Sequence, residues 1–166
     1  SLGSGSIMET TVKAVKKGEK GDPGELKGDF TVQRDVGTVT VNSDGGIFGT
    51  VSDASFPVQS EAVPVASADE VTTGRAVIRT TVCGDEIREY EVQIVKVYRD
   101  EDSTRNLLLR ITDPELLQTT GGIVQGMSGS PILQNGKLVG AVTHVMVNDP
   151  AQGYGIFAEN MLVRAG

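Results

Sequence analysis

Short runs rich in Val, Ile and Thr alternate with glycine-containing turns along almost the whole chain, and this pattern restricts the fold more than any other feature. Of the 166 residues, 21 are glycine, nearly twice the ordinary share of about 7%. Glycines between short β-branched runs are typical of tight turns that join short strands. The sequence therefore predicts an all-β fold, and its length suits a single domain with its own core.

Period-2 patterns and turn signals locate the expected strands. The strongest hairpin has apolar-alternating runs on both sides of Cys83–Glu86. In its second run the apolar parity changes at Ile94–Val95, which predicts a β-bulge. Asn135-Gly136 is typical of a two-residue hairpin turn. Further strands are expected at Met8–Val15, Phe30–Val41, Leu107–Ile111, Pro131–Gln134, Lys137–Val145 and Gly153–Phe157.

The segments between these runs are predicted to form turns, loops and short helices. Lys16–Asp29 is expected to be a turn-rich loop rather than collagen, because its Gly-X-Y period soon fails. Ser43–Gly46 is a turn signal. Pro114–Leu117 suits a single helical turn capped by Asp113, and Ala158–Arg164 suits a short closing helix.

Charge and rare residue types exclude several functions. The net charge is −7, which argues against nucleic acid as the main partner. No apolar run approaches the roughly 18 residues of a membrane helix, so membrane insertion by this chain is not expected. A single cysteine, Cys83, and a single histidine, His144, exclude an internal disulfide and multi-cysteine or multi-histidine metal sites. The acidic residues Asp100–Asp102, Asp44 and Asp53 lack calcium-loop spacing and are expected to be solvated, so neither metal nor organic cofactor is expected.

The segment Gly121–Pro131 (GGIVQGMSGSP) is the strongest candidate for chemistry. A phosphate-binding P-loop needs lysine where Met127 stands, and an α/β-hydrolase elbow needs glycine where Ser130 stands. The pattern fits better with the nucleophile loop of trypsin-like peptidases. Ser128 is then the candidate nucleophile, and the backbone amides of Gly126 and Ser128 are candidates for an oxyanion hole. A plain glycine-rich turn before a strand remains the alternative.

A serine nucleophile needs a base, and His144 is the only histidine. The two-residue hairpin turn would place Ser128 opposite Thr143, and strand alternation puts Thr143 rather than His144 on the face of Ser128. Three roles stay open for His144: general base, wall of a substrate cleft together with Thr143, or structural histidine. Asp113 and Asp149 are candidate acids, with a helix cap and a turn as their respective alternatives.

These motifs resemble those of the SpoIVB-type signalling serine peptidases of spore-forming bacteria. The resemblance covers essentially the whole chain and is most specific near the C-terminus. It implies a trypsin-like β-barrel peptidase domain in which Ser128 is the nucleophile and Asp113 the triad acid. The segments that carry it are Gly46–Thr50 (GIFGT), Ile111–Pro114 (ITDP), Gly121–Leu133 (GGIVQGMSGSPIL), Gly140–Pro150 (GAVTHVMVNDP) and Gly153–Gly155 (GYG).

The resemblance also implies a biological role. Such peptidases act between the forespore and mother-cell membranes, where they cleave a membrane-bound regulatory protein and themselves and so activate an intramembrane protease. Their membrane anchor, PDZ domain and catalytic histidine lie upstream of the stretch matched by this chain. We therefore expect residues 1–166 to form one N-terminally truncated peptidase domain with little activity of its own. A non-catalytic peptide-binding module is the open alternative.

Overall fold

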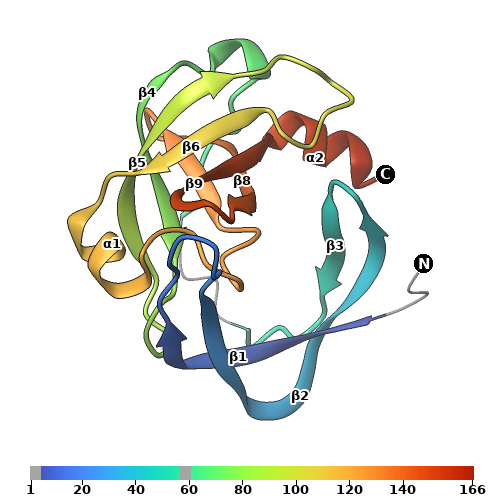
Figure 1. Ribbon diagram of the computed structural model, residues 1–166. Coiled ribbons are helices and arrows are strands. Elements are labelled where there is room, and N and C mark those ends of the chain that lie inside the picture. The colour runs from blue at the N-terminus through green and yellow to red at the C-terminus, as the bar shows by residue number, and fades with distance from the viewer. Residues whose placement is uncertain (1–4, 57–60) are drawn as a thin grey trace.

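The computed structural model describes residues 5–56 and 61–166, which form two β-structures (Figure 1). The first is a three-stranded antiparallel sheet in the order β1-β2-β3. The second is a closed barrel in the order β4-β5-β6-β9-β8-β7. The predicted all-β class is confirmed. The strands are β1 (Gly5–Lys16), β2 (Glu25–Ser43), β3 (Gly46–Val51), β4 (Gly74–Thr80), β5 (Arg88–Val97), β6 (Leu107–Ile111), β7 (Pro131–Gln134), β8 (Lys137–Met146) and β9 (Asp149–Phe157).

In the described residues, three short helices accompany these strands. They are the 3-10 helix η1 (Ala68–Glu70), α1 (Pro114–Thr120) between β6 and β7, and α2 (Ala158–Arg164) after β9. The closing helix α2 has the bounds that the sequence predicts. It packs mainly against β8 and β9.

The barrel encloses the main apolar core. Side chains at alternate positions of its strands point inward, as the period of two requires. Leu116 of α1 and Met127 of the following loop complete this core, and both are fully buried. Because burial of one such side chain stabilises the fold by about 1.5–3 kcal/mol, the barrel is the stable part of the molecule. Its fully buried strand residues include Ile78, Ile94, Leu107, Leu109, Ile132 and Phe157.

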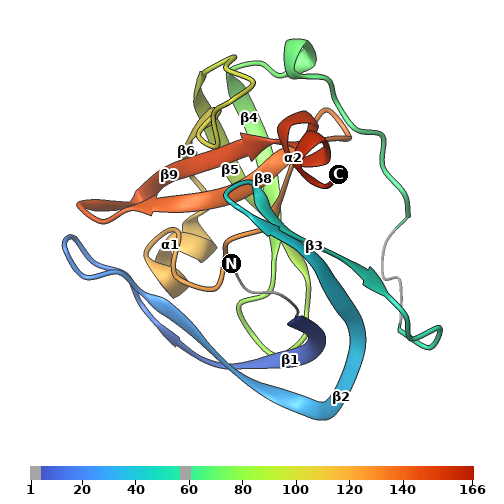
Figure 2. The ribbon, with the colours of Figure 1, turned by 90° about the vertical axis from the view of Figure 1, so that its right-hand side faces the viewer.

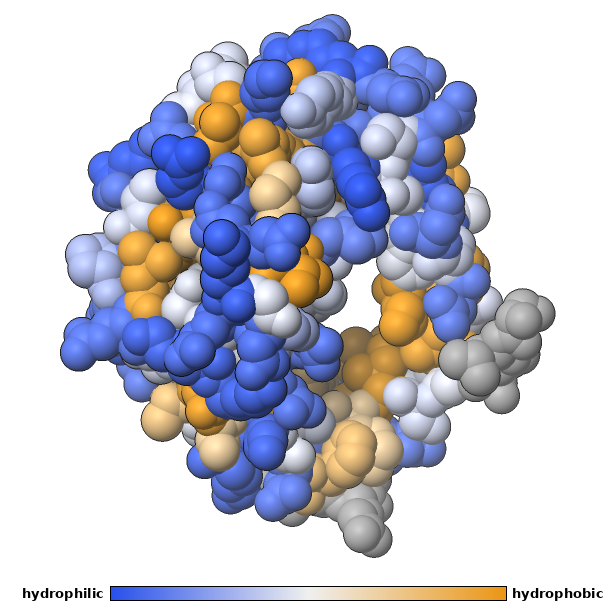
Figure 3. Space-filling model, viewed as in Figure 1, coloured by the Kyte–Doolittle hydropathy of each residue, from blue (hydrophilic) through white to orange (hydrophobic). Residues whose placement is uncertain are grey.

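The three-stranded sheet lies beside the barrel, and the long strand β2 runs from β1 to the hairpin with β3 (Figure 2). Among its described side chains, Val36 is fully buried and Leu26 packs against the barrel core. Phe30 and Ile47, in contrast, are 61% and 65% exposed. The space-filling view shows a hollow between this sheet and the barrel, bordered by apolar surface (Figure 3).

The hairpin predictions are confirmed. β4 and β5 pair along the whole of β4. β7 and β8 flank Asn135 and Gly136, whose φ angles of 52° and 75° are those that a tight hairpin turn demands. The parity change in β5 coincides with a register shift between Ile94 and Lys96 in the pairing of β5 with β6. Glycine turns and apolar alternation therefore locate the barrel hairpins.

Two predicted strand boundaries are wrong. β2 begins at Glu25, so residues 25–29 of the predicted loop belong to a strand, because they pair with the second half of β1. β9 begins at Asp149 rather than Gly153, because Met146 of β8 pairs with Asp149 across a short turn. In both cases the partner strand extends the pairing into residues whose own composition favours a turn.

Candidate active site

Ser128 lies in an exposed turn between α1 and β7. Met127 before it is fully buried and anchors the turn to the barrel core. The amide of Ser130 donates to the carbonyl oxygen of Met127 at 3.0 Å. Gly129 has a φ of +87°, a conformation that glycine adopts without steric cost. The buried methionine and the glycine together present Ser128 to solvent in a fixed turn.

The N-terminal sheet supports the other side of this loop. The amide of Leu26 donates to the carbonyl oxygen of Gln125 at 2.8 Å, and the amide of Gln125 donates to Gly24 at 2.9 Å. Gly126 has a φ of +99°, and a Cβ at this position would lie 3.1 Å from Leu26 Cβ. The shape of the nucleophile loop thus depends on both β-structures.

The amides of Gly126 and Ser128 are available as donors. Within residues 5–56 and 61–166 neither amide is hydrogen-bonded to an acceptor, whereas the amides of Met127 and Gly129 are bonded to backbone carbonyls. An oxyanion hole needs such unpaired donors at the point where negative charge develops. The two predicted donors are therefore unpaired, and their role as an oxyanion hole stays a prediction.

The hydroxyl of Ser128 contacts β8. Its Oγ donates to the carbonyl oxygen of Thr143 at 3.2 Å, although a register shift between Ile132 and Leu133 displaces the β7–β8 pairing from the predicted one. A carbonyl orients a hydroxyl but does not take its proton at neutral pH. In the described part of the chain no imidazole nitrogen is bonded to Ser128 Oγ.

His144 lies beside Thr143 with an exposed ring. Its Nδ1 is 2.9 Å from Thr143 Oγ1, and this hydroxyl donates to the carbonyl oxygen of Tyr154 at 3.2 Å. Because the hydroxyl has one proton, Nδ1–H donates to Thr143 and Nε2 keeps its lone pair. Partial burial lowers the pKa of His144, and Arg105 lowers it further. The imidazole is therefore neutral at pH 7.

A cleft of about 440 Å³ adjoins Ser128. Thr143 and His144 both line it, so the expectation from strand alternation that only Thr143 shares this side is wrong. The reason is a register shift between Val142 and His144 in the pairing of β8 with β9. One wall of the cleft comes from the barrel, and the other is the β2–β3 turn, Ser43–Gly46.

Asp113 caps helix α1. Its Oδ1 accepts hydrogen bonds from the amides of Glu115 and Leu116 at 3.0 and 3.2 Å, and its Oδ2 accepts one from Glu91 at 3.2 Å. The predicted helix cap is confirmed. These partners belong to α1 and β5, and none of them lines the cleft at Ser128. The role of Asp113 as triad acid stays a prediction.

The other residues singled out in the sequence have local roles. Asp149 accepts hydrogen bonds from the Ala151 amide at 3.3 Å and from Gln152 Nε2 at 2.6 Å, as in a turn. Cys83 is exposed in the β4–β5 loop. Among the described residues, no group of three or more His, Cys, Asp or Glu side chains could hold a metal ion. None of the described helices has the combined length and apolar character needed to cross a membrane.

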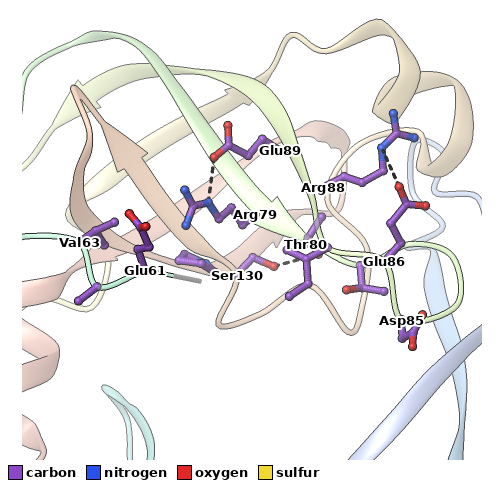
Figure 4. Close-up of a pocket in the computed structure, with 13 residues that line it drawn as sticks. Glu61, Val63, Arg79, Thr80, Asp85, Glu86, Arg88, Glu89 and Ser130 are labelled. Atoms are coloured by element: carbon purple, nitrogen blue, oxygen red, sulfur yellow. Dashed lines mark hydrogen bonds and ion pairs between the residues drawn. The ribbon is translucent and has the colours of Figure 1, made fainter. Parts of the chain in front are cut away.

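A larger cavity, of about 1040 Å³, lies behind the nucleophile loop (Figure 4). Residues 61–63 and the facing ends of β4 and β5 line it, with charged side chains such as Arg79 and Glu89. Ser130 borders this cavity, and its Oγ contacts Met127 O at 2.6 Å and Thr80 Oγ1 at 3.1 Å. Ser130 is thus a buried structural serine, and Ser128 alone of the two faces the cleft.

Asp44 is solvated as the sequence predicts, with 78% of its side chain exposed, but its place at the cleft is not predicted. It lies in the β2–β3 turn and lines the cleft together with Ser128. Its Oδ1 is 3.5 Å from Arg164 Nε. The local sequence Ser43–Gly46 predicts a turn and nothing more, because the approach to Ser128 arises from the packing of the sheet on the barrel.

Comparisons with known proteins show the family and the fold of the chain. A family model described as SpoIVB peptidase S55 matches residues 1–162. The solved Rv3671c protease in its inactive form is similar with a TM-score of 0.54 and 18% identity, over 77% of this chain and 64% of that chain. The active form from M. tuberculosis gives 0.53 and 17%, over 76% and 55%. The likeness shows an all-β, trypsin-like protease fold, and the matched part is less than two thirds of either solved chain. None of the curated proteins compared matches the chain.

Proposed function

Because the chain belongs to the SpoIVB peptidase S55 family, we propose that it carries the nucleophile of a serine endopeptidase and that Ser128 attacks the substrate. Membership of a peptidase family implies a protein substrate. One observation carries the serine assignment: Ser128 is exposed in a turn anchored by Met127, and the amides of Gly126 and Ser128 beside it are unbonded among the described residues.

The chemistry is acyl transfer. Ser128 Oγ forms a bond to the carbonyl carbon of the substrate while a base takes the hydroxyl proton. The carbonyl oxygen becomes an oxyanion, which the amides of Gly126 and Ser128 stabilise by roughly 3–4 kcal/mol each. The C–N bond then breaks, the base returns its proton to the leaving amine, and water hydrolyses the acyl-enzyme.

We further propose that these 166 residues by themselves acylate slowly. Ser128 Oγ is bonded to the carbonyl oxygen of Thr143, which does not act as a base. The one nitrogen of His144 that is hydrogen-bonded contacts Thr143 and not Ser128. The oxyanion hole and substrate binding alone leave an acceleration of roughly 10³–10⁴ over water.

Family membership also supports a narrower biological role. We propose that the substrate is a membrane-bound regulatory protein of sporulation and that the peptidase cleaves itself as well. The proposed location is the space between the forespore and mother-cell membranes. Cleavage there would activate an intramembrane protease. The support for these four statements is the family alone.

Reaction with a fluorophosphonate tests the nucleophile. We expect the folded chain to gain one adduct at Ser128, measured by intact mass, faster than the chain unfolded in urea, because the turn and its amides exist only in the fold. Ser128→Ala should abolish the adduct. Ser130→Ala is the matched control and should retain it, since that hydroxyl is buried. Equal rates for folded and unfolded chain would contradict the proposal.

A non-catalytic peptide-binding module is the second candidate function. The contact of Ser128 Oγ with a carbonyl in place of a base favours it. Such a module would bind peptides in the cleft and leave Ser128 unmodified by the fluorophosphonate. Peptide binding together with a labelling rate equal to that of the unfolded chain would support it.

A further inference from the structure

The peptide unit that joins Met127 to Ser128 carries one of the two candidate oxyanion donors, the N–H of Ser128. Its carbonyl oxygen, Met127 O, accepts two hydrogen bonds from one residue, Ser130. The backbone amide of Ser130 donates to it at 3.0 Å, and the hydroxyl Oγ donates to it at 2.6 Å. The peptide unit is therefore held through its carbonyl, while its N–H is bonded to no acceptor among the described residues.

The direction of this carbonyl fixes the direction of the donor. In a planar trans peptide unit the carbonyl and the N–H point in opposite directions. The bond between Met127 and Ser128 is trans, so a carbonyl directed at Ser130 directs the Ser128 N–H away from it. Ser130 borders the cavity behind the loop, whereas Ser128 lines the cleft. A flipped unit would instead present its carbonyl oxygen to the substrate and remove one donor from the oxyanion hole.

Thr80 of β4 extends this contact into a chain of hydrogen bonds. Its Oγ1 lies 3.1 Å from Ser130 Oγ, the contact that a dashed line marks in Figure 4. A carbonyl oxygen only accepts, and the Ser130 hydroxyl has one proton, so Ser130 Oγ donates to Met127 O and accepts from Thr80. Because hydrogen bonds in a chain polarise one another, Thr80 strengthens the bond from Ser130 to Met127.

Both hydroxyls are shielded from water, which would otherwise compete for the Met127 carbonyl. Thr80 and Ser130 are only 8% and 9% exposed. Thr80 pairs with Arg88 of β5, and the carbonyl oxygen of Ser130 accepts from the Val142 amide of β8 at 2.9 Å. The two hydroxyls thus stand on paired strands of the barrel, the rigid support that an oriented donor needs.

We propose that Ser130 is a positioning residue of the oxyanion hole. Its hydroxyl, supported by Thr80, holds the Met127 carbonyl so that the Ser128 N–H stays free for the oxyanion. Ser130 does not touch the substrate, and without its hydroxyl Met127 O keeps only the hydrogen bond from the Ser130 amide. The proposal rests on the proposed function of Ser128.

The rate of reaction with a fluorophosphonate tests this role. Ser128 Oγ bonds to phosphorus, the P–F bond breaks to release fluoride, the hydroxyl proton passes to the buffer, and the phosphonyl oxygen takes the place of the oxyanion. Ser130→Ala should still gain the adduct at Ser128, because the removed hydroxyl does not react. It should gain the adduct about tenfold more slowly, the upper end of what one hydrogen bond contributes. Loss of a whole oxyanion donor costs more, roughly 10²–10³ in rate.

Two variants show whether the hydroxyl itself matters. Ser130→Thr keeps the hydroxyl and should restore most of the labelling rate. Thr120→Val is the matched control for loss of a buried hydroxyl, since Thr120 is fully buried and its Oγ1 contacts Gly122 O at 2.6 Å. This control should lower Tm as Ser130→Ala does and label at the wild-type rate. Equal slowing in Thr120→Val and Ser130→Ala would mean a general loosening of the loop and would overturn the proposal.

Thr80→Val tests the same chain with both hydrogen bonds to Met127 left in place. We expect labelling to slow about two- to threefold, because the Ser130 hydroxyl loses only the support of its neighbour. Thr80→Ser should restore the rate. Should Ser130→Ala fail to fold, a wild-type rate for Thr80→Val would overturn the proposal by itself.

The carbonyl carbon of Met127, followed by NMR in the unlabelled chain, separates this proposal from the proposed function. Loss of a hydrogen bond at its oxygen should move the signal upfield in Ser130→Ala and leave it in place in Thr120→Val. That shift in a chain whose Ser128 is never labelled would support the Ser130 contact and refute the nucleophile. Labelling of Ser128 at one rate in wild type and Ser130→Ala would support the nucleophile and refute the positioning role.

Discussion

The closed barrel and the three-stranded sheet are both antiparallel but differ in strand pairing and burial. Every barrel strand is paired on both sides, and residues such as Leu109 and Ile132 are fully buried inside it. The sheet has two edge strands, and it exposes Phe30 and Ile47 by 61% and 65%. Closure removes sheet edges, whereas an open sheet must be covered or blunted at its edges. Stability should therefore be concentrated in the barrel.

The site draws on both structures in different ways. The barrel supplies Ser128 in a loop anchored by a buried methionine, where a rigid support favours a nucleophile. The sheet supplies Leu26, which packs against Gly126, and Asp44 on the opposite wall of the cleft. We infer that the sheet can line the cleft at Ser128 without contributing much of the free energy of folding. Substitutions in the barrel and in the sheet test whether the two structures differ in this way.

The largest difference should appear in core truncations. Leu109→Ala in the barrel should lower the free energy of unfolding by about 2–5 kcal/mol, because it removes a fully buried side chain and leaves a cavity. Phe30→Ala in the sheet should change it by no more than about 0.5 kcal/mol, the usual range for exposed positions. Urea unfolding measures both. Equal losses would show that the sheet contributes as much core as the barrel.

A smaller effect is expected from glycines of the two structures. Gly129→Ala should cost about 1–2 kcal/mol, because its φ of +87° is unfavourable for any residue with a Cβ. Gly5→Ala in β1 is the matched control. Its φ is not in this region, and the new Cβ would make an ordinary contact with Val39 at 3.4 Å, so the change should stay within about 0.5 kcal/mol. A neutral Gly129→Ala would mean that the turn relaxes easily.

Local sequence predicts the barrel's hairpins but not its closure. Asn135-Gly136 and the parity change at Ile94–Val95 are short-range signals, and both appear in the structure as predicted. The pairings that close the barrel, β4 with β7 and β6 with β9, join residues distant in sequence, for which no local pattern exists. Strand pairing likewise extended β2 and β9 into turn-like sequence.

Local sequence likewise predicts only part of the site. The glycine pattern around Ser128 indicates the nucleophile loop because the residues that form this loop are adjacent in the sequence. Asp44 is predicted to be a solvated turn residue, and its side chain is 78% exposed. Its place at the cleft is not predicted, since only the packing of the β2–β3 hairpin on α2 brings it there. For Asp113, in contrast, the local sequence predicts the contacts that the structure shows. Its position before Pro114 predicts a helix cap, and the cap is present.

The two aspartates, Asp113 and Asp44, should differ in what they contribute to stability. Asp113→Ala should cost about 1 kcal/mol of stability, because α1 loses its N-cap. Asp44→Ala should cost less than about 0.5 kcal/mol, since its ion pair with Arg164 is largely exposed on the aspartate side. Thermal unfolding at neutral pH measures both variants. A larger loss for Asp44→Ala would show that the turn contributes to the fold as well as to the cleft.

The smallest expected effect concerns His144, which lies in the cleft between barrel and sheet. Its pKa lies below the ordinary value of 6.5, first through partial burial and second through Arg105. Since it is the only histidine, an NMR titration of its ring follows this pKa without overlap. Arg105→Gln should raise the pKa part of the way back towards 6.5, because burial remains. A pKa at or above 6.5 in the wild-type chain would mean that the cleft is more open than the structure shows.

The lowered pKa of His144 determines whether the free energy of unfolding rises or falls with pH. Near pH 6 the unfolded chain binds more protons at His144 than the folded chain, so stability falls as the pH is lowered. The contribution of His144 is fully present above the unfolded pKa of about 6.5 and is lost as the pH falls through the lower folded pKa. His144→Gln should therefore lose less stability than wild type between pH 7 and pH 5, measured by urea unfolding. If both proteins lose the same amount, neither burial nor Arg105 lowers the pKa of His144 in the folded chain.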